Sequence, residues 1–124
     1  MPIAVLVVDD SRLARRQLQR SLPSDWDIEV TTAADGVEAM AAIKDGKAEL
    51  IFLDLTMPKM DGYQVLKAIK AQNLAVTVIV VSADVQVEAR KRVMALGALE
   101  FIKKPVDIEK LGTILHQFGF IAQA

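Results

Sequence analysis

The stretch "LIFLDLTMP", residues 50–58, places a carboxylate directly after an apolar run. Four apolar residues, 50–53, precede Asp54, and a run of this kind is typical of a strand buried on both faces. A carboxylate is seldom buried unless a partner or a metal ion compensates its charge. Asp54 is therefore predicted at the end of a buried strand, where its presence calls for a chemical reason.

The rest of the chain alternates between apolar runs and amphipathic stretches. Strands are predicted over residues 3–8, 28–33, 50–53, 76–81 and 100–102. Helices are predicted over residues 11–22, 36–46, 63–72, 85–96 and 107–118, with Leu13, Val37, Val85 and Ile108 among their apolar positions and Asp107 as an N-cap. Five strands alternating with five helices indicate right-handed βαβ units, hence an α/β protein with helices on both faces of a parallel sheet.

Length, charge and composition narrow the function classes. The 124 residues suit a single domain, residues 1–124. A net charge of −1, from 15 basic and 16 acidic residues, gives no basic surplus for direct nucleic-acid or anionic-membrane binding. The chain has no cysteine, which excludes disulfides and thiolate chemistry. Without a signal peptide or an apolar run near ~18 residues, the expected compartment is the cytoplasm.

Polar residues follow four of the five predicted strands. Asp9 and Asp10 follow the first, Asp54 the third, Ser82 ends the fourth, and Lys104 follows the fifth. Taken singly, the first aspartates and the serine are simply explained as helix caps, Asp54 as a loop acceptor and the lysine as solvated. The carboxyl ends of parallel strands meet at one edge, however, and ligands bind there. Their coincidence favours a functional site.

Three clustered carboxylates predict a bound cation. They repel one another and raise one another's pKa unless a cation intervenes. Their hard oxygens select Mg²⁺, with Mn²⁺ as a substitute, over zinc or copper. A hydroxyl and an ammonium at the same edge suit the oxygens of a transferring phosphoryl group. Asp54 is therefore predicted to be a nucleophile toward phosphorus beside a metal ion.

These motifs together resemble one family. "DLTMPKMDG" (54–62), the acidic pair, Ser82-Ala83 and "GALEFIKKP" (97–105) resemble the receiver domains of bacterial two-component response regulators, and the single-domain chemotaxis regulators in particular. The resemblance covers residues 3–118. It implies a flavodoxin-like sheet of order 2-1-3-4-5. It also implies a phosphorelay module that catalyses only its own phosphorylation and dephosphorylation.

The resemblance assigns the acidic residues. Asp54 would accept a phosphoryl group from a sensor histidine kinase or a histidine phosphotransfer protein. Asp10, Asp54 and the backbone carbonyl of Thr56 would bind Mg²⁺ directly, and Asp9 largely through water. Met57-Pro58 and Gly62 would shape the loop below the acceptor.

The resemblance also assigns the residues that read the phosphate. Ser82 would donate a hydrogen bond to a phosphoryl oxygen. Lys104, whose bond to the following proline is typically cis in the family, would pair with the phosphate. Phe101 stands where a switch aromatic, often tyrosine, turns inward on activation. Thr56 and Asp84 would tune the phosphoryl lifetime. We expect Lys103 to face solvent and His116, the only histidine, to be solvated on the last helix.

Other functions and partners stay open at this point. A phosphohydrolase of the haloacid-dehalogenase type also uses an aspartate nucleophile, but normally has a second acid two residues on, where this chain has Thr56. A receiver that binds partners without phosphorylation is a third class. The expected partner face lies within residues 85–118, for a downstream protein, a fused output domain or a homodimer. It offers Arg90, Lys91 and Arg92 beside Val87 and Met94. The tail 119–124 would be either a chain end or the start of a linker.

Overall fold

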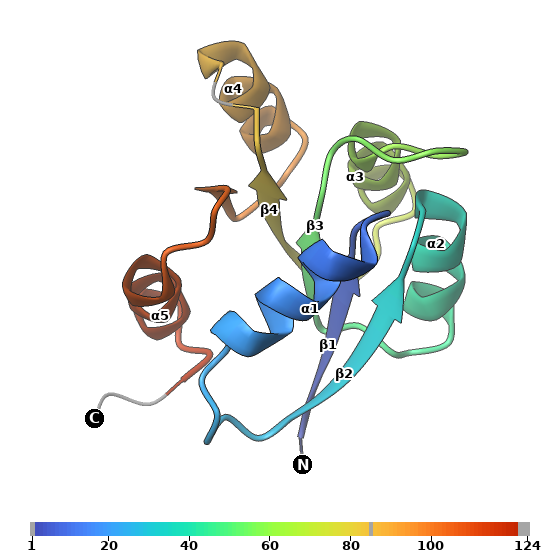
Figure 1. Cartoon of the computed structure of the whole chain (residues 1–124). Coiled ribbons are helices and arrows are strands. Elements are labelled where there is room, and N and C mark those ends of the chain that lie inside the picture. The colour runs from blue at the N-terminus through green and yellow to red at the C-terminus, as the bar shows by residue number, and fades with distance from the viewer. Residues whose placement is uncertain (1, 85, 122–124) are drawn as a thin grey trace.

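A computed structural model describes residues 2–84 and 86–121, and its centre is a five-stranded parallel sheet (Figure 1). The strands are β1 Ile3–Val8, β2 Ile28–Ala33, β3 Leu50–Leu53, β4 Thr77–Ser82 and β5 Glu100–Lys103. Their order is β2-β1-β3-β4-β5. The helices are α1 Arg12–Ser21, α2 Gly36–Lys44, α3 Gly62–Ala71, α4 Val87–Ala95 and α5 Ile108–Gln117. The flavodoxin-like α/β prediction is thus confirmed.

The two faces of the sheet bury separate apolar clusters. The cluster under α1 and α5 contains Val5, Val7, Leu50, Phe52, Ile79 and Val81. The cluster under α2, α3 and α4 contains Leu6, Val8, Ile51, Leu53, Val78 and Val80. Successive strand residues alternate between the faces, so strands covered on both sides need apolar residues throughout. This explains the uninterrupted apolar runs of β1, β3 and β4.

Three apolar residues that the helical pattern placed on buried faces are exposed instead. Leu13, Val37 and Ile108 lie in the first turns of α1, α2 and α5. These turns begin at the carboxyl edge of the sheet, and their first residues extend past the apolar faces of the strands. Val85, predicted in the same role on α4, lies outside the described residues.

Capping fixes where most helices begin. The side chains of Ser11, Asp35, Asp61 and Asp107 each accept a backbone N–H of the following helix, and Asp61 forms a capping box with Gln64. The cap of α1 is therefore Ser11, which leaves the acidic pair before it available for another role. Among the described residues, no helix has both the length and the hydropathy that crossing a membrane requires.

Candidate functional site

Three of the predicted carboxylates meet at the carboxyl edge of the sheet. Asp9, Asp10 and Asp54 each offer one oxygen, and these oxygens lie within 4.8 Å of one another. Asp9 and Asp54 are buried, whereas Asp10 is exposed. The sheet ladder itself places the buried pair, since the Asp9 N–H donates to Ala33 O and the Asp54 N–H donates to Val8 O. The strand backbones thus bring the three acids together.

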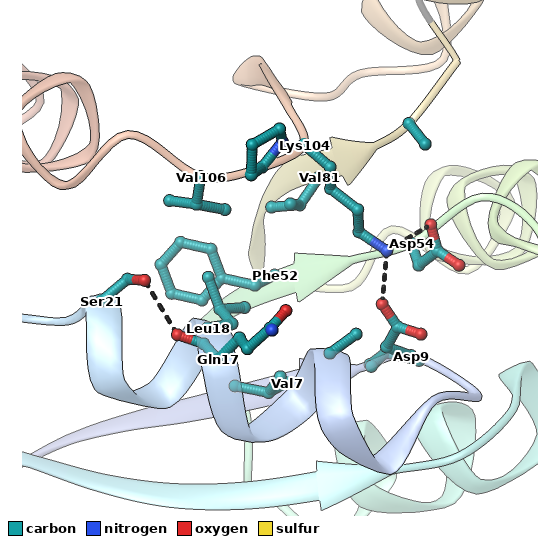
Figure 2. A pocket seen from close by; sticks show the side chains of 14 residues that line it. Val7, Asp9, Gln17, Leu18, Ser21, Phe52, Asp54, Val81, Lys104 and Val106 are labelled. Atoms are coloured by element: carbon teal, nitrogen blue, oxygen red, sulfur yellow. Dashed lines mark hydrogen bonds and ion pairs between the residues drawn. The ribbon is translucent and has the colours of Figure 1, made fainter.

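Lys104 bridges the two buried carboxylates. Its Nζ donates to Asp9 Oδ2 at 2.7 Å and to Asp54 Oδ1 at 3.4 Å. Figure 2 shows the lysine reaching from the chain that follows β5 across to both acids. The Lys104–Pro105 peptide bond is cis. Of the two lysines at this strand end it is Lys104 that enters the site, while Lys103 is exposed as expected.

Burial and charge shift two pKa values in this cluster. Burial raises the pKa of Asp54, the charge of Asp9 raises it further, and Lys104 opposes both effects. Burial lowers the pKa of Lys104, but the hydrogen bond to Asp9 and the two carboxylate charges raise it above its ordinary value. Lys104 therefore stays charged. The raised pKa of Asp54 means that its ionised form is disfavoured here, so an added positive charge would stabilise the carboxylate.

The β1–α1 loop holds its two aspartates differently. Asp9 Oδ1 accepts from the Ser11 N–H at 2.9 Å, and Asp9 O accepts from Arg15 Nη1 at 2.7 Å. Together with its N–H and Oδ2, every polar atom of Asp9 is engaged. Within the described chain the Asp10 carboxylate has no hydrogen bond, so it is the acid most free to ligate a cation. Arg15 was not expected at this site, because its contact depends on how α1 packs over the loop.

The β3–α3 loop packs directly against the backbone of Asp54. A Cβ on Gly62 would lie 2.4 Å from Asp54 O and 2.8 Å from Leu55 Cα, so only glycine fits. The Gly62 N–H donates to Leu55 O at 3.0 Å, and Lys59 adopts a φ of 66° within the turn. Thr56, two residues after Asp54, is exposed. The backbone of this loop sets the position of Asp54.

Ser82 ends β4, and neither Ser82 nor Phe101 has a side-chain hydrogen bond to the acids in the described structure. Ser82 is buried, and its Oγ accepts from the Asp84 N–H at 3.1 Å, so in this structure it stabilises the β4–α4 turn. Asp84 is exposed, and its Oδ1 accepts from the Gln86 N–H. Phe101 is half-buried against the cluster under α2–α4. Ser82 therefore holds the turn before α4 in this structure and also lies at the strand edge that carries the acids.

Asp9 and Asp54 stand at one end of an apolar cleft of about 480 Å³ between α1 and the chain after β5. Its floor is Phe52, flanked by Val7 and Val81, and Leu18 and Val106 form the walls (Figure 2). This cleft could not be predicted from the sequence, because it depends on the separation of α1 from residues 104–106. Low-dielectric walls of this kind strengthen the electrostatic interactions of the adjacent charges.

The prediction of a solvated His116 is wrong. The residue is only partly exposed, and Nε2 is buried with no hydrogen-bond partner in the described structure. It lines a groove with Trp26 and Phe120, and Trp26 Nε1 donates to Phe120 O at 3.0 Å. The chain after α5 folds back over this corner, which a helical pattern ending at residue 118 does not reveal.

The donor set fits a hard divalent cation. The cluster offers carboxylate oxygens only, two of them buried and one exposed, and an ammonium already bridges the buried pair. Oxygen donors with one side open to water are what Mg²⁺ prefers in sites that handle phosphate. Neither thiolate nor imidazole lies in the cluster, which disfavours zinc and copper.

Comparisons with known proteins point to one family. The family described as "Response regulator receiver domain" matches residues 5–116. A "Response regulator MprA" from Mycobacterium sp. (strain KMS) is 34% identical over 111 residues, covering 90% of this chain and 48% of the relative. A "Protein-glutamate methylesterase/protein-glutamine glutaminase 2" from Koribacter versatilis (strain Ellin345) is 42% identical over 109 residues, covering 86% and 30%. The chain spans about half or less of these relatives.

Solved structures show the same fold over nearly the whole chain. A chain in the "CheX-CheY-BeF3-Mg+2 complex" from Borrelia burgdorferi aligns with a TM-score of 0.84 and 37% identity, covering 95% of this chain and 90% of that one. The chemotaxis protein CheY4 of Vibrio cholerae aligns with a TM-score of 0.82 and 31% identity, covering 94% and 98%.

Proposed function

Because this chain belongs to the family of response regulator receiver domains, which act in two-component signalling, we propose that it accepts a phosphoryl group on Asp54 and thereby switches a partner-binding surface. The observation that carries the proposal is the position of Asp54. It is a buried carboxylate at the end of β3, beside two further aspartates and in contact with the Lys104 ammonium. Membership of this family disfavours the phosphohydrolase alternative.

The proposed transfer begins with an attack by an Asp54 carboxylate oxygen on phosphorus. The P–O bond to Asp54 forms as the P–N bond to a donor histidine breaks, and the electron pair of that bond returns to the imidazole. In a separate hydrolytic step, water attacks phosphorus and the bond between phosphorus and the Asp54 oxygen breaks, which releases inorganic phosphate and restores the carboxylate. The domain would thus act only on its own phosphoryl group.

The chain's own residues would hold the metal and the phosphate. Asp10, Asp54 and the Thr56 backbone carbonyl would ligate Mg²⁺, or Mn²⁺ in its place, with Asp9 acting through water. When bound, the cation supplies charge neutralisation for the phosphoryl oxygens. Lys104, already between two carboxylates, would turn to pair with the phosphate, and Ser82 would donate to one of its oxygens after releasing the Asp84 N–H.

We propose a histidine kinase or histidine phosphotransfer protein as the donor, and a cytoplasmic setting. The signal would leave through described residues 86–118, toward a downstream protein, a fused output domain or a second copy. On this face Val87 and Met94 are exposed, as expected. Two of its cations have local partners, since Arg90 pairs with Glu100 at 3.3 Å and Arg92 stacks on Tyr63 at 3.8 Å. Thr56 and Asp84 are both exposed, and we propose that they affect the phosphoryl lifetime.

Intact-mass measurement after incubation with acetyl phosphate and Mg²⁺ tests the proposal. Wild type should gain one phosphoryl group, and removal of Mg²⁺ with a chelator should prevent the gain. Asp54→Asn should not be modified, whereas Asp45→Asn, at an exposed position outside the site, should behave as wild type. Equal modification of Asp54→Asn would place the acceptor elsewhere, and absence of any modification in wild type would favour a receiver that works without phosphorylation.

A further inference from the structure

Among the described residues, Arg15 is the only arginine of α1 whose side chain forms a hydrogen bond or ion pair with the β1–α1 loop. Its Nη1 donates to the backbone carbonyl of Asp9 at 2.7 Å, and the residue is partly buried. The first turn of α1 places the Arg15 side chain beside this loop, because Ser11 caps the helix and the Arg15 N–H donates to Ser11 O at 3.0 Å. The charge-assisted hydrogen bond is short and of the stronger class.

The carbonyl that Arg15 holds belongs to the peptide unit joining Asp9 to Asp10. Asp9 has three further polar atoms engaged, with Ala33, Ser11 and Lys104. The Asp10 carboxylate, in contrast, has no hydrogen bond in the described structure and is exposed. Its position therefore depends on the backbone that carries it, and the orientation of that backbone depends on the peptide plane that Arg15 fixes.

We infer that Arg15 is a positioning residue of the divalent-metal site, holding the Asp9–Asp10 peptide so that Asp10 presents its carboxylate to the cation. The inference rests on the proposed metal site. It adds a partner outside the ligand set, and partners of this kind orient ligands and contribute to metal affinity. Arg15 acts through the backbone and touches neither the metal nor the phosphoryl group.

The neighbouring Arg16 supplies a matched control. It lies on the same helix and carries the same charge, but it is exposed and its side chain makes no ion pair or hydrogen bond in the described structure. Arg16→Met therefore removes an equal charge without touching the Asp9 carbonyl. Arg15→Met keeps much of the aliphatic stem and removes the donors. Arg15→Lys keeps the charge and offers a single point donor instead of the planar fork.

Mg²⁺ titrations followed by amide chemical shifts, with urea unfolding in the absence of metal, test the inference. Arg15→Met should weaken Mg²⁺ binding about tenfold, Arg15→Lys should recover part of that loss, and Arg16→Met should match wild type. The phosphorylation rate with acetyl phosphate should require more Mg²⁺ in Arg15→Met yet reach the wild-type maximum at saturating metal. A higher Mg²⁺ requirement with an unchanged maximal rate distinguishes a positioning role from a general loss of stability.

Two results would overturn the positioning role alone. The first is that Arg15→Met and Arg16→Met bind Mg²⁺ with equal affinity while wild type binds Mg²⁺ as expected. The other is a lowered unfolding free energy with unchanged Mg²⁺ affinity, which would make Arg15 a structural residue only. Failure of wild type itself to bind Mg²⁺ would instead overturn the metal site on which the inference rests.

Discussion

The two loops that carry the acids are built by different means. Side chains hold the β1–α1 loop, where Asp9 is engaged by the Ser11 amide, Arg15 and Lys104. Backbone contacts hold the β3–α3 loop, where Gly62 packs on the Asp54 carbonyl and donates to Leu55 O. The first loop leaves one carboxylate, Asp10, exposed and unbonded, whereas the second buries its carboxylate at the strand end.

This difference follows the roles proposed for the two loops. A nucleophile must sit at a fixed distance from the reacting atom, and small displacements reduce the rate strongly. Close backbone packing around Asp54 meets that need. A metal ligand instead adjusts when the cation enters or leaves, which an exposed carboxylate on a loop held by side chains permits. Changes in the β3–α3 loop should therefore affect the fold, and changes in the β1–α1 loop should affect metal binding.

The largest expected effect is that of Gly62→Ala. The new Cβ would meet the Asp54 carbonyl at 2.4 Å, so either α3 or the acceptor strand end must shift. Overpacking of this kind should lower the unfolding free energy by roughly 2–3 kcal/mol, as measured by urea denaturation. The variant should also accept phosphate more slowly, because Asp54 moves.

Gly112→Ala is the matched control for that experiment. Gly112 lies within α5, and a Cβ there meets no atom within 4 Å. Alanine is the better helix former by roughly 1 kcal/mol, so this variant should be more stable than wild type. A Gly62→Ala protein as stable as wild type would show that the β3–α3 loop is not held by close backbone packing.

Lys104→Met should come next in size. It removes the ammonium between two carboxylates, and the metal-free protein should lose about 1–2 kcal/mol, the range for a charged hydrogen bond at a partly exposed site. The raised pKa of Lys104 means that this contribution is present below the ordinary lysine value and is lost as the pH rises through the folded-state pKa. The gap between the two proteins should therefore close in the alkaline range.

Lys104→Met should also affect signalling, and this effect should be larger than its modest effect on the unfolding free energy. Lys104→Met should still bind Mg²⁺ and be phosphorylated, but should not show the amide shifts of the activated state with beryllofluoride. Lys103→Met, one residue away and exposed, should signal normally. Loss of activation in the Lys103 variant with a normal Lys104 variant would reverse the assignment of the two lysines.

Asp54→Asn should change the unfolding free energy less than Lys104→Met does, and it should raise that free energy instead of lowering it. The raised pKa of Asp54 means that its favourable contribution is present below its unfolded-state pKa and is lost as the pH rises through the folded-state pKa. Without metal, the neutral amide should make the variant more stable than wild type at neutral pH. Thermal unfolding across pH should show this advantage shrinking in acid, and Mg²⁺ should reverse it by binding wild type, with its third carboxylate, more tightly than the variant.

The sequence predicted the site's members better than their mutual contacts. The strand ends could be predicted because polar residues follow four of the five apolar runs, and the strand order brings Asp9, Asp10, Asp54 and Lys104 to one edge. The Arg15 contact and the apolar cleft could not be predicted from the sequence, because both depend on how α1 packs over the sheet. The environment of His116 was missed for a related reason, since residues beyond α5 fold back to enclose it.

The smallest expected effect on stability is that of Phe101→Tyr, which tests how the signal leaves the site. The Phe101 ring is half-buried against the cluster under α2–α4, so its inward state gains apolar burial at ~25 cal/mol per Å² without losing an outward hydrogen bond. A tyrosine hydroxyl would favour the outward, hydrated state, and the unfolding free energy should change by no more than ~0.5 kcal/mol.

The same preference should be visible in the amide chemical shifts of residues 86–118. Without phosphate or beryllofluoride, these shifts should lie closer to their beryllofluoride-bound values in wild type than in the tyrosine variant. Shifts confined to the loops around Asp54 when beryllofluoride is added, with residues 86–118 unchanged in both proteins, would show that Ser82 and Phe101 do not form the switch.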